Sequence, residues 1–130
     1  MNNLLVDMAD NSEFESVGQK LESMTVSEVL EAASVSSYVE VTPEGGVILD
    51  QEIIENGFEN GEEVEIYFNP DKDMMLLREI EGDDSFEIFY KDSRGRILLY
   101  NLLEDRDLLP DYNKEFVAVI FEGYPIICFN

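Results

Sequence analysis

The chain has 130 residues, of which 30 are acidic, 8 are basic and none is histidine, so its formal net charge is -22 at pH 7. Because such a field repels phosphate backbones and anionic membranes, nucleic acid is an unfavourable ligand and a basic protein is the expected partner. The single cysteine, Cys128, and the lack of histidine exclude an internal disulfide and a thiolate or imidazole metal cage.

The hydrophobic residues, 45% of the chain, are enough for one domain of ordinary size to close a core. The acidic N-terminal stretch has no long apolar run, and no segment approaches the roughly 20 apolar residues of a membrane helix. We therefore expect a cytoplasmic protein that does not contact membranes. The acidity has two interpretations, a surface that attracts a basic partner or a merely solvated surface produced by adaptation to the environment.

Two short helices are predicted near the N-terminus. Ser12 and Glu15 have the spacing of a capping box, and Thr25 and Glu28 repeat it. Apolar residues then recur at helical intervals, namely Phe14, Val17 and Leu21 in the first helix and Val26, Val29, Leu30 and Ala33 in the second. These apolar faces either cover the sheet or dock a partner helix.

The next part of the chain predicts strands and one short helix. The expected strands are 38–41, 47–49, 63–68 and 74–77. A turn at 43–46 separates the first two strands. Residues 51–56 allow little more than a helical turn, for which Gly57 can supply a left-handed cap. In the strand 63–68 apolar and polar residues alternate, so one face of that strand is expected to be wet.

The same order recurs after the loop-like residues 81–84. The expected strands of this second half are 86–90, 96–100, 116–121 and 126–129. A short helix is predicted from Leu102, Leu103, Leu108 and Leu109, and Pro110 is expected to terminate it. The last hairpin is apolar on both faces, which predicts a central position in the fold.

Gly45 and Gly95 therefore open two copies of one pattern, a strand, a short helix and a hairpin, with a period suited to one supersecondary unit. We predict a mainly β fold with short helices, of the α+β class. Its expected parts are a helical extension at 1–37, a first repeat at 38–82 and a second repeat at 83–130. The two repeats are expected to form one domain.

The two copies carry short motifs of a known kind. The second repeat has Asp92, Gly95 and Arg96 before three apolar residues, and Leu103 at an apolar helix position. The first repeat has Gly45 before three apolar residues at 47–49, then Gly57-Phe58 and the strand 64–68. In these positions the chain resembles the AbrB/MazE/SpoVT swapped-hairpin domains of bacterial regulators.

Two copies in one chain are similar to the MraZ arrangement of that family. The resemblance implies two interleaved swapped-hairpin repeats in one pseudo-twofold barrel, preceded here by the two added helices. Each half of such a barrel buries the edges and the apolar face of the other. The protein is therefore expected to be a monomeric pseudo-dimer or a homodimer.

The resemblance also implies DNA binding, through arginines at the turn and on the short helix, and here the chain departs from the family. The turn position is Gly46 in the first repeat, although Arg96 is kept in the second. The helix pair is Ile54-Glu55 in the first repeat and Glu104-Asp105 in the second, with Arg106 just beyond. Carboxylates at these positions repel phosphates, so the fold can persist while the inherited activity is lost.

Two sets of candidate site residues follow. The acidic set, expected to bind the partner, comprises Glu55, Glu59, Glu62, Glu63, Glu104, Asp105 and Asp107. The basic set, expected as a residual nucleic-acid contact, comprises Arg94, Arg96 and Arg106. For Arg94 and Arg96 the alternative is an internal salt network with Asp92, Glu104 and Asp105. No catalytic residue, metal ligand or cofactor is predicted, because adjacent carboxylates in turns are usually solvated and histidine-dependent nucleophiles are absent. We expect no enzymatic activity.

The expected function is that of a non-enzymatic interaction or regulatory protein. Its strongly acidic surface would bind a basic protein, by DNA mimicry or as an antitoxin-like partner. The alternative is an AbrB-like transcription regulator that still binds DNA through its arginines.

Overall fold

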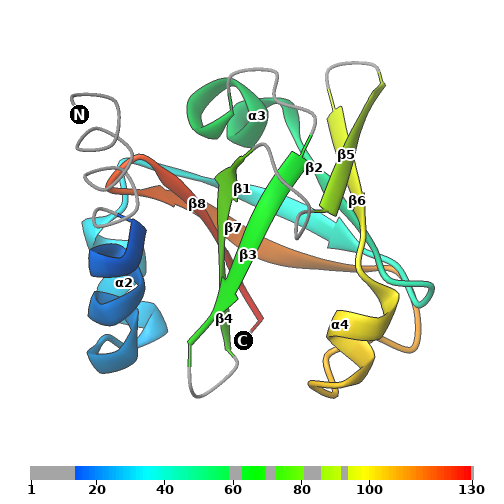
Figure 1. The fold of residues 1–130 in the computed structure, drawn as a ribbon, viewed down its shortest axis with the longest axis horizontal. Coiled ribbons are helices and arrows are strands. Elements are labelled where there is room, and N and C mark those ends of the chain that lie inside the picture. The colour runs from blue at the N-terminus through cyan, green and yellow to red at the C-terminus, as the bar shows by residue number, and fades with distance from the viewer. Residues whose placement is uncertain (1–13, 59–62, 70–72, 81–85, 92–93, 130) are drawn as a thin grey trace, which may run out of the picture.

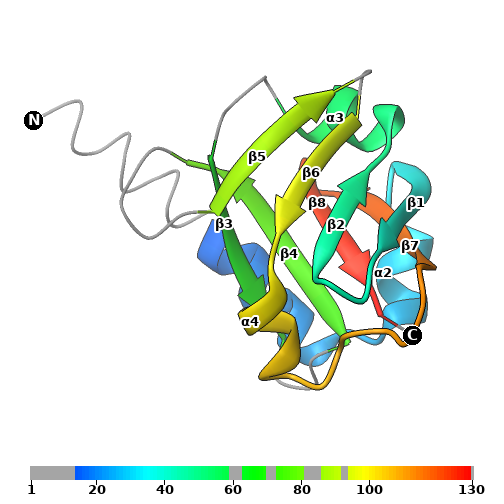
Figure 2. The same cartoon turned by 90° about the vertical axis from the view of Figure 1, so that its right-hand side faces the viewer.

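The computed structural model describes residues 14–58, 63–69, 73–80, 86–91 and 94–129, and their strands form a closed antiparallel barrel (Figures 1 and 2). The strands are β1 Val35–Val41, β2 Gly46–Leu49, β3 Glu63–Phe68, β4 Met74–Glu79, β5 Phe86–Lys91, β6 Arg94–Leu98, β7 Lys114–Phe121 and β8 Tyr124–Cys128. The helices are α2 Val26–Ala32, α3 Gln51–Gly57 and α4 Tyr100–Glu104, and residues 14–23 are also helical. The mainly β fold with short helices is thereby confirmed.

The order of strands around the barrel is β1-β2-β6-β5-β3-β4-β8-β7. The chain runs through β1, β2, α3, β3 and β4, and then through β5, β6, α4, β7 and β8, which is again two strands, a helix and two strands. Each hairpin has both of its outer neighbours in the other half of the chain: β1 pairs with β7, β2 with β6, β3 with β5 and β4 with β8. Exchanging the two halves leaves every pair of neighbouring strands in this order unchanged.

The interior of the barrel is filled by the inward residues of every strand. They include Val39, Val41, Val47, Leu49, Val64, Met75, Leu77, Ile97, Ala118 and Ile127, all 1% exposed or less. Ile53 and Ile54 of α3 and Leu103 of α4 pack onto the same cluster. Each large aliphatic side chain buried in this way stabilises the fold by about 1.5–3 kcal/mol.

A second apolar cluster lies between the outer face of the barrel and the N-terminal helices. Phe14, Val17 and Leu21 of the helical segment 14–23 and Val29 of α2 are buried in it. The barrel contributes Met74, Leu76, Val119, Phe121, Ile126 and Cys128. The last hairpin is apolar on both faces because one face lines the barrel and the other supports these helices, which confirms the helices as a cover on the sheet.

The predicted capping box of α2 is confirmed. Thr25 Oγ1 accepts a hydrogen bond from the Glu28 N–H at 3.2 Å, and Glu28 Oε1 accepts one from the Thr25 N–H at 3.1 Å. The equivalent box at Ser12 lies outside the described residues, although Glu15 is helical.

The end of α4 differs from the prediction. Asp107 has a left-handed φ of 57°, and Leu108 N–H donates to the Leu103 carbonyl oxygen at 2.9 Å. Together with a bond of 3.0 Å from Asp107 N–H to the Glu104 carbonyl oxygen, this is a Schellman motif. The helix therefore ends at this motif, before Pro110, and Leu108 packs against the barrel core beyond it.

Two strand boundaries and one helix cap differ from their predictions. β6 begins at Arg94 and ends at Leu98, because its ladder to β5 already starts at the pair Lys91 and Arg94. β1 begins at Val35, since β7 is long enough to pair with all seven of its residues. Gly57 does not cap α3 in a left-handed conformation. A Cβ there would lie 2.5 Å from Pro125 Cγ, so close packing is what requires glycine.

Candidate functional site

The acidic candidates on and next to α3 and α4 lie at two ends of the barrel (Figures 1 and 2). Glu55 is exposed on α3 and accepts a hydrogen bond from Gln51 Nε2 at 2.7 Å. Glu104 and Asp105 are exposed at the end of α4, and Asp107 follows in the Schellman motif. Since α3 and α4 lie at opposite ends, the structure does not bring these carboxylates into one cluster.

The other acidic candidates lie elsewhere. Glu63 is half-buried at the start of β3, opposite Glu87 of β5. Glu59 and Glu62 lie outside the described residues. A hydrogen bond joins Glu104 to the Tyr100 hydroxyl, and this bond raises the pKa of Tyr100.

The three candidate arginines are not gathered into one groove. Arg94 and Arg96 are both exposed on the outer face of β6. Arg106 instead lies over the Phe68 ring, with its guanidinium carbon 4.4 Å from the ring centroid, and donates from Nη1 to the Leu102 carbonyl oxygen at 3.1 Å. The Arg106 guanidinium therefore takes part in contacts within the fold.

Arg94 shares one surface hollow with three carboxylates. A hollow of about 240 Å³ is lined by Arg94 together with Glu40, Asp50 and Glu115. Glu40 and Glu115 stand directly opposite each other on β1 and β7. Like charges in such a pair repel, and a neighbouring arginine offsets that repulsion.

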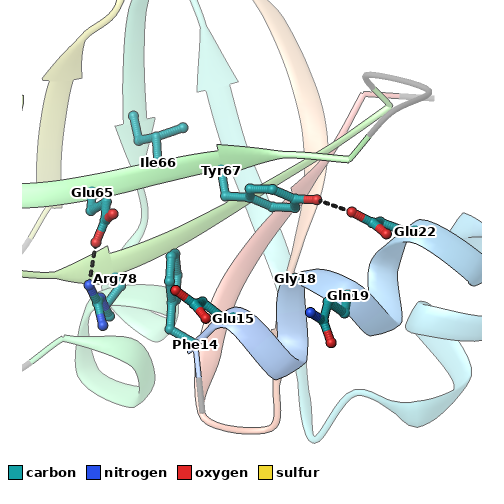
Figure 3. A pocket seen from close by; sticks show the side chains of 9 residues that line it. All are labelled: Phe14, Glu15, Gly18, Gln19, Glu22, Glu65, Ile66, Tyr67 and Arg78. Carbon is teal, nitrogen blue, oxygen red and sulfur yellow. Dashed lines mark hydrogen bonds and ion pairs between the residues drawn. The ribbon is translucent and has the colours of Figure 1, made fainter. Parts of the chain in front are cut away.

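A hollow of about 520 Å³ lies between the helical segment 14–23 and the strands β3 and β4 (Figure 3). We call it the helix–strand groove. Its lining residues are Phe14, Glu15, Gly18, Gln19, Glu22, Glu65, Ile66, Tyr67 and Arg78. From the sequence, Phe14 and Glu15 were named only as parts of a predicted helix, and residues 65–67 only as parts of a predicted strand. No motif marks the set as a site, so the groove was not predicted.

The helix contributes one wall of the groove. Phe14, Val17 and Leu21 are buried on the sheet, which leaves Glu15 and Glu22 exposed two helical turns apart and therefore on one face. Gly18 lies between them, close to Tyr67, since a Cβ at Gly18 would be 3.3 Å from the ring atom Cε1. Glycine thus lets the helix approach the strand while the groove stays open.

The strands contribute the other wall. Glu65 and Arg78 are cross-strand neighbours on β3 and β4 and form an ion pair. The Arg78 guanidinium also lies over the Phe14 ring, 4.4 Å from its centroid. This stacked and paired cation joins the helix to the barrel.

Tyr67 closes the far part of the groove. Its hydroxyl donates a hydrogen bond of 2.9 Å to Glu22 Oε1, as the dashed line in Figure 3 shows. Burial, with the hydrogen bond to Glu22 and the charge of Glu22 as further causes, raises the pKa of Tyr67. The Tyr67 hydroxyl therefore stays protonated, and can donate a hydrogen bond, across the physiological pH range.

The charge of the groove is negative. Glu15, Glu22 and Glu65 face a single arginine in its lining, and two aromatic rings stand beside them. Carboxylates beside aromatic faces attract cations through both Coulomb and cation–π interactions. The arrangement is therefore suited to bind a cationic group.

Other kinds of chemistry find little support in the described part of the chain. No group of three or more aspartate, glutamate or cysteine residues there is placed to hold a metal ion, and no helix there is long and apolar enough to cross a membrane. Cys128 is buried, and this burial, with the charge of Asp73, raises the pKa of its thiol to about 11. Cys128 therefore acts as a small core residue, because a buried thiol with a raised pKa stays protonated and is not a nucleophile.

Comparison with family models, with curated proteins and with solved structures finds no match for this chain.

Proposed function

We propose that this protein is a non-enzymatic interaction protein that binds a basic protein through its acidic surface, on a barrel of two swapped-hairpin repeats. The interleaved strand order supports the repeat interpretation, because every hairpin lies between strands of the other half. A single-repeat protein would need a second chain to supply those neighbours.

The observation that carries the proposal is the charge at the positions where the resembled family binds DNA. Glu55 on α3 and Glu104 and Asp105 on α4 are exposed carboxylates. Arg106, the cation beyond them, lies over Phe68. The whole chain has a net charge of -22, and the side chains at these positions expose negative charge to solvent, as a phosphate backbone does.

The sharp form of this proposal is DNA mimicry, in which the carboxylates occupy the nucleic-acid site of a basic protein. The milder form is an antitoxin-like or regulatory partner that neutralises a basic surface without imitating a duplex. Both forms predict association that is accelerated by long-range attraction and weakened by salt.

A titration with a labelled arginine-rich peptide tests the proposal. We expect tight binding at low salt, and a loss of affinity of at least about tenfold when the ionic strength rises from roughly 0.05 M to roughly 0.5 M, because salt screens exposed charges. A polyglutamate of the same charge is the control. If the barrel binds the peptide no better than this flexible polymer does, the acidity is only a solvated surface and the proposal fails.

The second candidate function is a DNA-binding transcription regulator. The exposed pair Arg94 and Arg96 on the outer face of β6 favours it. In that case, substitution of both arginines by glutamine should abolish binding of a labelled duplex in a low-salt mobility-shift assay.

A further inference from the structure

We propose that the helix–strand groove is the anchor for one arginine side chain of the basic partner. This inference rests on the proposed function and names the contact that would give it specificity. The occupant is a guanidinium that donates to the Glu22 carboxylate beside Tyr67, and the charge of Glu15, two helical turns away, adds long-range attraction.

The groove already holds one guanidinium in this way. Arg78 lies over the Phe14 ring at 4.4 Å from its centroid and pairs with Glu65. A carboxylate beside an aromatic face is a favourable site for the planar, weakly hydrated guanidinium group. The same combination recurs further along the groove, where the Tyr67 ring stands beside Glu22.

The charge of the groove leaves room for a second cation. Arg78 and Glu65 neutralise each other, whereas Glu15 and Glu22 have no cation opposite them in the groove lining. The nearest lysine of the helix, Lys20, is paired at 2.7 Å with Glu122 in the turn between β7 and β8. An incoming guanidinium would therefore meet an excess of negative charge.

The shape of the groove favours arginine over lysine. Its volume of about 520 Å³ falls in the range of sites that take small ligands, about 300–1,000 Å³. A guanidinium can donate to the single carboxylate of Glu22 from two N–H groups in a fixed plane, whereas Glu15, two helical turns away, contributes only its charge. An ammonium group would gain the charge interaction but neither the stacking nor the paired donors.

A double variant, Glu15→Gln with Glu22→Gln, tests the anchor. Glutamine keeps a hydrogen-bond acceptor for the Tyr67 hydroxyl and preserves the shape of the helix face, so the fold should be retained. The matched control is Glu31→Gln with Asp111→Asn, which removes two exposed carboxylates outside the groove and changes the net charge equally. Circular dichroism checks that both variants fold.

The probes are two labelled peptides of equal length and charge, one rich in arginine and one rich in lysine. We expect the groove variant to weaken arginine-peptide binding by about tenfold, the effect of one charge-assisted contact, and the control by less than about twofold. The lysine peptide should bind the wild-type protein more weakly and lose less in the groove variant.

The anchor is wrong if the groove variant and the control lose the same affinity for the arginine-rich peptide, or if the wild-type protein binds both peptides equally. Either result would still agree with an acidic protein that binds a basic partner. If the wild-type protein binds neither peptide, the proposed function itself is wrong and the anchor falls with it.

Discussion

Cutting the chain between residues 82 and 83 is expected to leave neither half folded as a monomer. The fragment 1–82 retains β1 to β4, and each of its two hairpins loses both outer neighbours, which belong to the other half. Isolated two-stranded hairpins are at best marginally stable in water, and open edges with apolar faces favour association. We therefore expect each separated half to lose the whole barrel structure, not only a part of it.

Mixing the two fragments should restore the barrel. We expect a one-to-one complex with the circular dichroism spectrum and the cooperative unfolding of the intact chain, measured with analytical ultracentrifugation to fix the stoichiometry. Formation of homodimers by one fragment would also fit, because the halves are topologically equivalent. A monomeric fragment that unfolds cooperatively by itself would show that the halves are separate units.

Replacing Gly45 by alanine is expected to lower the free energy of unfolding by more than about 3 kcal/mol, through strain and a backbone clash. Gly45 has φ +84° in the turn between β1 and β2. A Cβ there would lie 2.4 Å from Tyr100 Cα, and the Gly45 carbonyl oxygen accepts the Leu99 N–H at 2.8 Å. The clash is with backbone of the other half, so neither partner can move cheaply.

Gly123 provides the matched control for this substitution. It has nearly the same φ, +86°, in the turn between β7 and β8, but a Cβ there would meet no atom within 4 Å. The Gly123→Ala variant should therefore lose only about 1–2 kcal/mol, the cost of the left-handed backbone alone. Equal destabilisation of the two variants in urea unfolding would contradict the close approach of Gly45 to Tyr100.

Much of the fold follows from local patterns. The alternation in β3 identified its strand, and the spacing of Thr25 and Glu28 identified the start of α2, because both signals depend on residues close in sequence. The end of α4 was missed because Asp107 is a less common left-handed residue than glycine, so Pro110 was taken as the stronger signal.

The helix–strand groove depends on where a helix docks, which no local pattern specifies. Glu65 and Tyr67 were expected on a wet face of β3, and the helical segment 14–23 instead covers that face. Arg106 was likewise predicted from the sequence as a nucleic-acid contact, although its guanidinium lies over Phe68 of a distant strand. Such contacts join residues far apart in sequence, and only the three-dimensional arrangement brings them together.

The most direct test of the account is a parallel measurement at low salt of wild-type protein with a labelled DNA duplex and with the labelled arginine-rich peptide. The account predicts that the peptide binds and is released as salt rises, while the duplex does not bind because the field of the protein repels it. Duplex binding that weakens with salt and disappears when Arg94 and Arg96 are replaced by glutamine would contradict it.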